Sequence, residues 1–172
     1  MVRTITLSLL ALASLLAAST AFAGHRTACS GPAYRQFDFF AGDWDAYDLD
    51  APGKPVARNH VEIVLNGCVI HEDYQQGDGL HGESYSLYDS ARDVWHQSWV
   101  TNRGGLLLMD GGWHDGRMTF EGDQAGQSGK SARVRVAWIP QGENVRETAA
   151  RSLDGGRSWQ PLFDMLFKPH RH

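Results

Sequence analysis

Ten short segments rich in β-branched and aromatic residues follow one another from residue 43 to residue 168, and turns rich in Gly, Pro, Asn or Asp separate them. The clearest turn is Asn66-Gly67, because Asn and Gly tolerate the positive φ angles of a tight hairpin. Successive hairpins make neighbouring strands antiparallel, and about ten strands in one small domain curl and close. The sequence therefore predicts an all-β fold, a closed antiparallel up-and-down β-barrel of about ten strands.

The connecting segments set the expected strand boundaries. A polar, glycine-rich stretch over residues 122–131 is expected to be the longest loop. The expected strands are residues 43–50, 56–65, 68–75, 81–88, 94–100, 106–113, 117–121, 132–139, 144–152 and 158–168.

A compact apolar segment, Phe37-Asp38-Phe39-Phe40-Ala41-Gly42-Asp43-Trp44, leads into the first strand. Many small barrels that hold ligands begin with such a turn followed by Gly-x-Trp. We expect Trp44 to plug one end of the barrel, and Gly42 to let the chain bend tightly beside it. A short helical turn over residues 34–40 fits the same segment.

The N-terminus has the three parts of a secretory signal peptide. Arg3 supplies the positive charge, Ile5 to Ala18 is a short apolar core, and Ala21-Phe22-Ala23 is a small-x-small cleavage site. The alternative is a membrane anchor, but the apolar core is shorter than a bilayer-spanning helix. We therefore expect a signal peptide over residues 1–23, one barrel domain over residues 24–172, and a periplasmic or secreted protein without stable membrane insertion.

Cys29 and Cys68 are the only cysteines. In an oxidising compartment an even pair favours a disulfide, which would tie the N-terminal tail to the Asn66-Gly67 turn. Two separate buried thiols are the alternative.

The charge balance argues against nucleic acid as a partner. Lys and Arg number 16, Asp and Glu number 20, and the formal net charge is −4. A mildly acidic chain lacks the basic surface that nucleic acids and anionic membranes attract. Nothing in the pattern specifies an oligomeric state.

Several familiar kinds of site are not indicated. The eight His residues show no metal-ligand spacing, and no Gly-x-Ser-x-Gly elbow or glycine-rich phosphate loop is present. The segment Ser152–Trp159 matches the Asp-box pattern of sialidase propellers, but it occurs once, whereas a propeller needs one per blade. We interpret it as a structural hairpin corner, and we expect neither metal nor cofactor.

Polar groups alternate with large aromatic side chains on several predicted strand faces, which suits a largely apolar cavity with a few polar anchors. An inward Arg135 or Arg146 would bind a carboxylate or phosphate group, and Glu72 would pair with it when no ligand is present. The alternative places the charges on the solvated face and fills the core with Trp. The candidate ligand-binding residues are Glu72, Tyr85, Trp95, Gln97, Trp99, Phe120, Arg135 and Arg146.

An ordered set of motifs resembles a group of exported bacterial proteins known as a domain of unknown function, which is similar to the calycins, the lipocalin and fatty-acid-binding-protein barrels. The motifs are Phe37-Asp38-Phe39, Gly42-Asp43-Trp44, Gly67-Cys68 with Glu72, Gly82, Trp95 to Trp99, and Ser152–Trp159. The resemblance implies a closed barrel with a ligand-sized interior and carries no established activity. Nitrobindin-like haem barrels are a minority alternative, because Asp45-Ala46-Tyr47-Asp48 after Trp44 departs from their pattern.

The leading interpretation is an exported barrel that binds a small hydrophobic or amphipathic molecule in its interior. One alternative is an enzyme of isomerase, cyclase or hydrolase type, in which Glu72 acts as general acid or base with a pKa raised by burial. Another is a structural envelope protein with a solid core. Because fold does not determine function, the side chains that line the interior decide among them.

Overall fold

A computed structural model describes residues 28–51, 53–125 and 131–171. The expected signal peptide, residues 1–23, lies outside the described residues. The described chain is almost entirely β-structure with three short 3-10 helices. The helices are η1 (Pro32–Arg35), η2 (Asp38–Phe40) and η3 (Leu65–Gly67). The strands are β1 (Gly42–Asp48), β2 (Ala57–Val64), β3 (Val69–Gln76), β4 (His81–Asp89), β5 (Val94–Thr101), β6 (Leu106–His114), β7 (Arg117–Ala125), β8 (Ser131–Gln141), β9 (Asn144–Ser152) and β10 (Gln160–Pro169).

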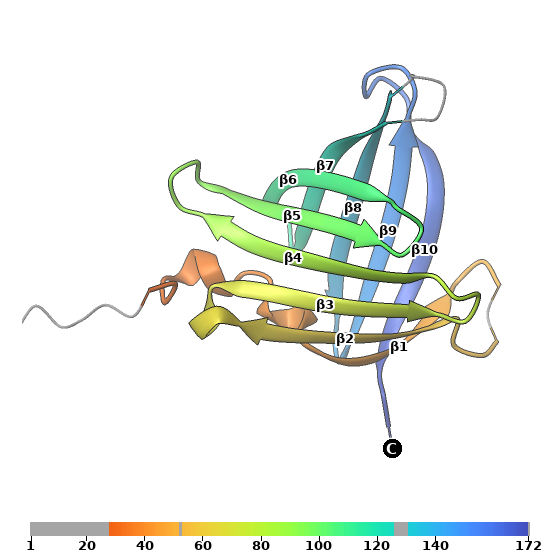
Figure 1. Ribbon diagram of the computed structural model, residues 1–172, viewed down its shortest axis with the longest axis horizontal. Coiled ribbons are helices and arrows are strands. Elements are labelled where there is room, and N and C mark those ends of the chain that lie inside the picture. Colours follow the sequence, from red (N-terminus) through yellow and green to blue (C-terminus); the bar gives the residue numbers. More distant parts are fainter. Residues whose placement is uncertain (1–27, 52, 126–130, 172) are drawn as a thin grey trace, which may run out of the picture.

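The ten strands form one closed, antiparallel, up-and-down barrel in which each strand pairs with its neighbours in sequence. The first and last strands close it, with Trp44 opposite Pro169 and Asp48 opposite Met165. In Figure 1, β2 to β5 run across the view while β8 to β10 run steeply past them. The predicted fold class is confirmed.

The strand boundaries agree closely with the sequence prediction, except around residues 122–131. There, Gly122 pairs with Val134 and Gln124 pairs with Ala132, so β7 and β8 extend into the stretch expected to be a loop. This polar sequence is also sheet, because the hydrogen bonds between antiparallel strands are made by the backbone. Residues 126–130 lie outside the described residues.

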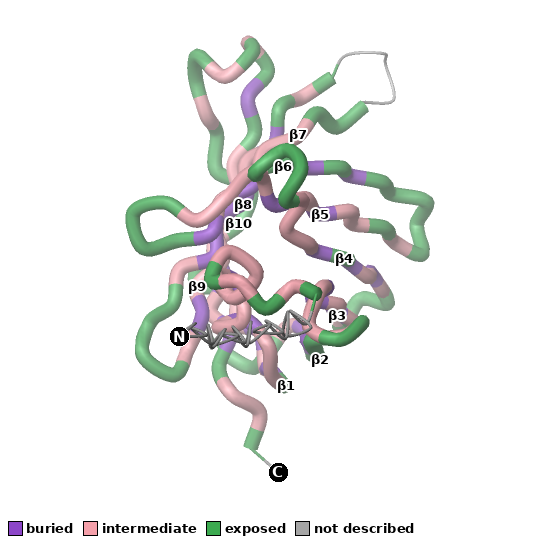
Figure 2. The backbone as a smooth tube through the Cα atoms, turned by 90° about the vertical axis from the view of Figure 1, so that its left-hand side faces the viewer, coloured by how far each residue is buried: buried purple, intermediate pink, exposed green. Residues whose placement is uncertain are grey.

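The segment from Phe37 to Trp44, called the plug below, closes one end of the barrel. Phe37 and Phe40 are buried to 0% and 1% exposure and stack with ring centroids 5.5 Å apart. The Trp44 indole Nε1 donates to the Phe40 carbonyl at 2.9 Å. A Cβ on Gly42 would lie 3.1 Å from the Trp44 ring, so glycine makes room for it. Figure 2, which views this side, shows the segment lying across the barrel end.

Three contacts made by the residues just before the plug fix it to the barrel. Cys29 and Cys68 form a disulfide, as predicted, at the hairpin between β2 and β3. The Arg35 guanidinium donates to the Gly67 carbonyl, and the Trp95 indole donates to the Gln36 side chain at 3.0 Å. The chain leading into the plug is therefore held to the β2–β3 hairpin by the disulfide and the Arg35 bond, and to β5 by the Trp95 bond.

The Asp-box segment forms the corner between β9 and β10. Asp154 accepts hydrogen bonds from the backbone N–H groups of Arg157 and Ser158 at 3.0 and 2.9 Å. Gly155 has φ of 73°, and the Trp159 indole donates to the Gly156 carbonyl. The hydroxyl groups of Ser158 and Ser152 also donate to the Asp154 carboxylate. Together with the backbone bonds, they lower the pKa of Asp154 to about 2. The predicted structural role of the motif is confirmed.

Among the described residues, no helix is long and apolar enough to cross a bilayer.

Candidate functional site

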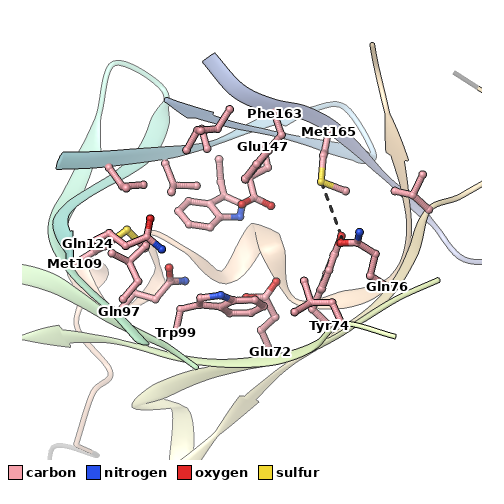
Figure 3. A pocket seen from close by; sticks show the side chains of 18 of the residues that line it. Glu72, Tyr74, Gln76, Gln97, Trp99, Met109, Gln124, Glu147, Phe163 and Met165 are labelled. Atoms are coloured by element: carbon pink, nitrogen blue, oxygen red, sulfur yellow. Dashed lines mark hydrogen bonds between the residues drawn. The ribbon is translucent and has the colours of Figure 1, made fainter. Parts of the chain in front are cut away.

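The barrel interior contains a cavity of about 460 Å³. This volume lies in the range of small-molecule pockets. Its lining includes residues at the strand ends away from the plug, such as Asp48, Gln76, Gln124 and Phe163, so the cavity opens at that end. Figure 3 looks into it. The described lining residues are Asp48, Val56, Glu72, Tyr74, Gln76, Leu80, Gln97, Trp99, Leu107, Met109, Gln124, Val134, Val136, Trp138, Glu147, Ala149, Leu162, Phe163 and Met165.

A hydrogen-bonded polar network lies along the inner faces of β2 to β5. The two oxygens of Glu72 each accept one bond, from Asn59 Nδ2 at 2.9 Å and from Ser84 Oγ at 2.7 Å. Gln97 Nε2 extends this network, because it donates to Ser84 Oγ at 3.4 Å and to Ser86 Oγ at 3.0 Å. All five side chains are buried. Because buried polar groups are stable only when they are paired, this network fixes the Glu72 carboxyl in place.

Large apolar and aromatic side chains supply the rest of the wall. Trp99 extends over Gly82 on the neighbouring strand, where a Cβ would lie only 2.3 Å from its ring carbons. Trp138 lies at the closed end of the cavity, where its ring centroid is 5.4 Å from that of Phe37 in the plug. Val134, Val136, Ala149 and Met165 extend the apolar wall along β8 to β10.

Glu147 is a second acidic side chain in the cavity, and sequence reasoning missed it. It lies on β9 between the inward residues Val145 and Ala149. The residues opposite it on the neighbouring strands are Trp138 of β8 and Met165 of β10. Figure 3 shows Glu147 and Glu72 on opposite walls. The signal was present in the sequence, because Val145, Glu147 and Ala149 share one face of an alternating strand.

Burial raises the pKa of both interior carboxyls. For Glu72, loss of hydration raises the pKa, and the bonds from Ser84 and Asn59 oppose the rise. The pKa of Glu147 is raised well above its ordinary value by the same loss of hydration and by the negative charge of Glu72. No described residue donates a hydrogen bond to Glu147 to offset this. The bonds from Asn59 and Ser84 favour the ionised form of Glu72, and no described residue makes such a bond to Glu147.

Two buried polar atoms of the interior have no partner among the described residues, Trp138 Nε1 and Asn59 Oδ1. Trp138 lines the cavity and Asn59 adjoins it through Glu72. A buried donor or acceptor without a partner costs about 1–3 kcal/mol. For Trp138 Nε1, a hydrogen-bond acceptor on an occupant of the cavity, or water within it, would relieve this cost.

Three of the residues predicted to bind a ligand, Glu72, Gln97 and Trp99, do meet in the cavity. Trp95 and Phe120 also point inward, but they belong to the closed end. Their rings pack around Phe37 with centroids 6.0 and 5.8 Å away.

The inward placement considered for Arg135 and Arg146 is wrong. Arg135 donates to Glu121 on the outer face, 2.6 Å away, and lies over the Trp159 ring. Arg146 pairs with Asp164 on β10. The physical reason is strand alternation, since the inner face of β8 holds Val134, Val136 and Trp138 instead.

Tyr85 also lies outside the barrel. It is 45% exposed and stacks on His71 with ring centroids 4.8 Å apart. The inner face of β4 carries Gly82, Ser84 and Ser86, whose small side chains leave space for Trp99 and the Glu72 network. A polar inner face and an aromatic outer face invert the usual pattern, which is why the prediction failed there.

One surface grouping has ligand atoms close enough for a metal ion, formed by Asp73, His81 and Glu83. Asp73 and His81 already pair with each other at 3.2 Å, and Glu83 lies 3.3 Å from His71. All three are partly exposed, so the cluster is accounted for by surface ion pairs.

No protein-family model and no curated protein sequence matches this chain.

The cavity can supply shape, an apolar aromatic wall and three acidic groups, Glu72 and Glu147 inside and Asp48 near the open end. Among the described lining residues there is no Lys, Arg or His. The haem alternative therefore lacks the usual proximal His at this wall. The enzyme alternative finds Glu72 inside, but its hydrogen-bond partners among the described residues are Asn59 and Ser84 rather than a His or Tyr.

Proposed function

We propose that this protein is a calycin-like binding protein that holds a small amphipathic molecule inside its barrel and acts outside the cytoplasm. The observation that carries the proposal is the cavity of about 460 Å³, closed by the Phe37–Trp44 plug and open at the opposite end. Aromatic walls with a few fixed polar groups are typical of small-molecule sites.

The cavity counts against a structural protein with a solid core, because a packed interior would leave no space of this size. The Cys29–Cys68 disulfide is typical of oxidising compartments, which fits the signal peptide expected over residues 1–23.

A pair of adjacent residues provides the test. Leu107 lines the cavity and is 8% exposed, whereas Leu108 points outward and is 50% exposed. Leu107→Trp should fill part of the cavity, and Leu108→Trp is the matched control. Binding of a neutral apolar fluorescent probe, N-phenyl-1-naphthylamine, should weaken at least tenfold in Leu107→Trp and remain near wild type in Leu108→Trp. The proposal fails if wild type binds no probe, or if both variants bind it equally.

A further inference from the structure

We propose that the molecule held in the cavity is an amphipathic amine whose protonated nitrogen lies between the carboxyl groups of Glu72 and Glu147. This inference rests on the proposed function and names the ligand class. It reverses the expectation of an arginine anchor for an anionic ligand, because both candidate arginines lie outside.

The charge of the lining is the first argument. Glu72 and Glu147 line opposite walls, and Asp48 lies in the lining near the open end, with no described cationic side chain to balance them. An anionic ligand would enter a cavity that is already acidic. A protonated amine instead supplies the missing positive charge, because buried carboxylates are stable when paired.

The hydrogen bonds give the second argument. Glu72 is held by two donors, but Glu147 has no described hydrogen-bond partner. An ammonium group has three donors and no acceptor, so it can bond the Glu147 carboxyl while its charge favours the ionised form of both carboxyls. Glu147 is therefore the acceptor to which such a ligand would donate.

The aromatic wall is the third argument. Tyr74, Trp99, Trp138 and Phe163 line the same cavity, and aromatic faces attract cations as well as covering apolar groups. A bare metal ion fits less well, because the described residues bring three ligand groups together only on the outer surface. An organic cation with an apolar body uses both the rings and the carboxyls.

Binding should also move a proton. The titratable groups facing Glu147 across the cavity are Glu72 and Tyr74 on β3, with Asp48 in the lining of β1. Its cross-strand neighbours Trp138 and Met165 do not titrate in this range. Burial also raises the pKa of Tyr74, so that it stays neutral. A bound ammonium would favour the ionised form of Glu147, so binding should release a proton at any pH where Glu147 of the free protein is still protonated.

The test compares three probes with the same apolar body, 4-phenylbutylamine, 4-phenylbutan-1-ol and 4-phenylbutanoate, by calorimetric titration of the full chain. Wild type should bind the amine at least tenfold more tightly than the alcohol, and the butanoate most weakly. In Glu147→Gln the preference for amine over alcohol should fall below threefold. Titrations in two buffers of different ionisation enthalpy should show proton release in wild type and none in this variant.

Glu143→Gln, at the exposed turn before β9, is the matched control and should keep the amine preference. If the alcohol or the butanoate binds wild type as tightly as the amine, or if Glu147→Gln keeps the full preference, the amine inference is overturned while the binding function stands. If none of the three probes binds while N-phenyl-1-naphthylamine does, only the amine inference is overturned; if that probe also fails to bind, the proposed function fails as well.

Discussion

Glu147 faces an apolar wall and a second carboxyl, so its ionisation opposes folding. Because its folded pKa is raised above the unfolded value, its contribution to stability is fully present below the unfolded pKa, near 4.5, and is lost as pH rises through the folded pKa. Each unit of difference between the two pKa values corresponds to about 1.4 kcal/mol. Glu147→Gln cannot ionise and should escape this loss.

We therefore expect Glu147→Gln to be more stable than wild type at pH 9 and close to wild type at pH 4, with the difference growing as pH rises. Urea unfolding at pH 4, 7 and 9 measures the difference, with Glu143→Gln as an exposed control. Parallel pH curves for wild type and Glu147→Gln would show that the carboxyl is not held in the apolar environment described.

Gly82 determines where Trp99 lies. A Cβ at this position would come within 2.3 Å of the indole, so Gly82→Ala should force the ring to move within the cavity. Overpacking of this kind costs about 1–3 kcal/mol. We expect lower thermal stability, changed Trp fluorescence and weaker probe binding. Gly53→Ala is the control, because a Cβ there meets nothing within 4 Å. An unchanged Gly82→Ala protein would contradict the placement of Trp99.

The plug is the element whose attachment can be tested separately from the strands. The Cys29–Cys68 disulfide joins residues separated by 39 positions in the chain. Removing a bridge over a loop of this length typically costs about 2–4 kcal/mol. The double variant Cys29→Ser/Cys68→Ser should unfold at a lower denaturant concentration. The ten strands remain paired, so its far-ultraviolet circular dichroism should stay that of the barrel. A spectrum of an unfolded chain at neutral pH would show instead that the barrel needs the tether in order to form.

Strands and turns were predictable from sequence because their signals are local. Asn66-Gly67 and the Asp box each specify a turn within a few residues, and the alternation between turns specifies strands. The exception, Gly122 to Ala125, is polar and became sheet through pairing with β8. Such pairing depends on a partner strand and is not encoded in the segment alone.

It was harder to predict which side chains point into the barrel, because each strand has two faces and the sequence must indicate which of them is the inner one. On β8 the apolar choice, Val134, Val136 and Trp138, would have placed Arg135 outside correctly. On β4 the same rule fails, because Ser84 points inward to bond Glu72 while Tyr85 faces out. The interior is polar on one side only, and that asymmetry follows from the assembled network rather than from any single strand.

At the scale of the whole molecule, the barrel divides its charges between outside and inside. Outside, carboxyls such as Asp110 and Asp164 have pKa values lowered by bonds from Arg92 and Arg146. Inside, Glu72 and Glu147 have raised pKa values and no cationic partner among the described residues. The outer pairs are of the kind that accounts for surface charge in many proteins, whereas the unbalanced inner pair is typical of a binding site.

The central claim is that the cavity is occupied in the working protein, and native mass spectrometry of protein purified from its own host tests it most directly. The account predicts a complex heavier than the chain by one small molecule, which fragmentation identifies as an amphipathic amine, and which is lost in Leu107→Trp but retained in Leu108→Trp. A mass equal to the chain alone, in a protein that also binds none of the apolar probes, would contradict it.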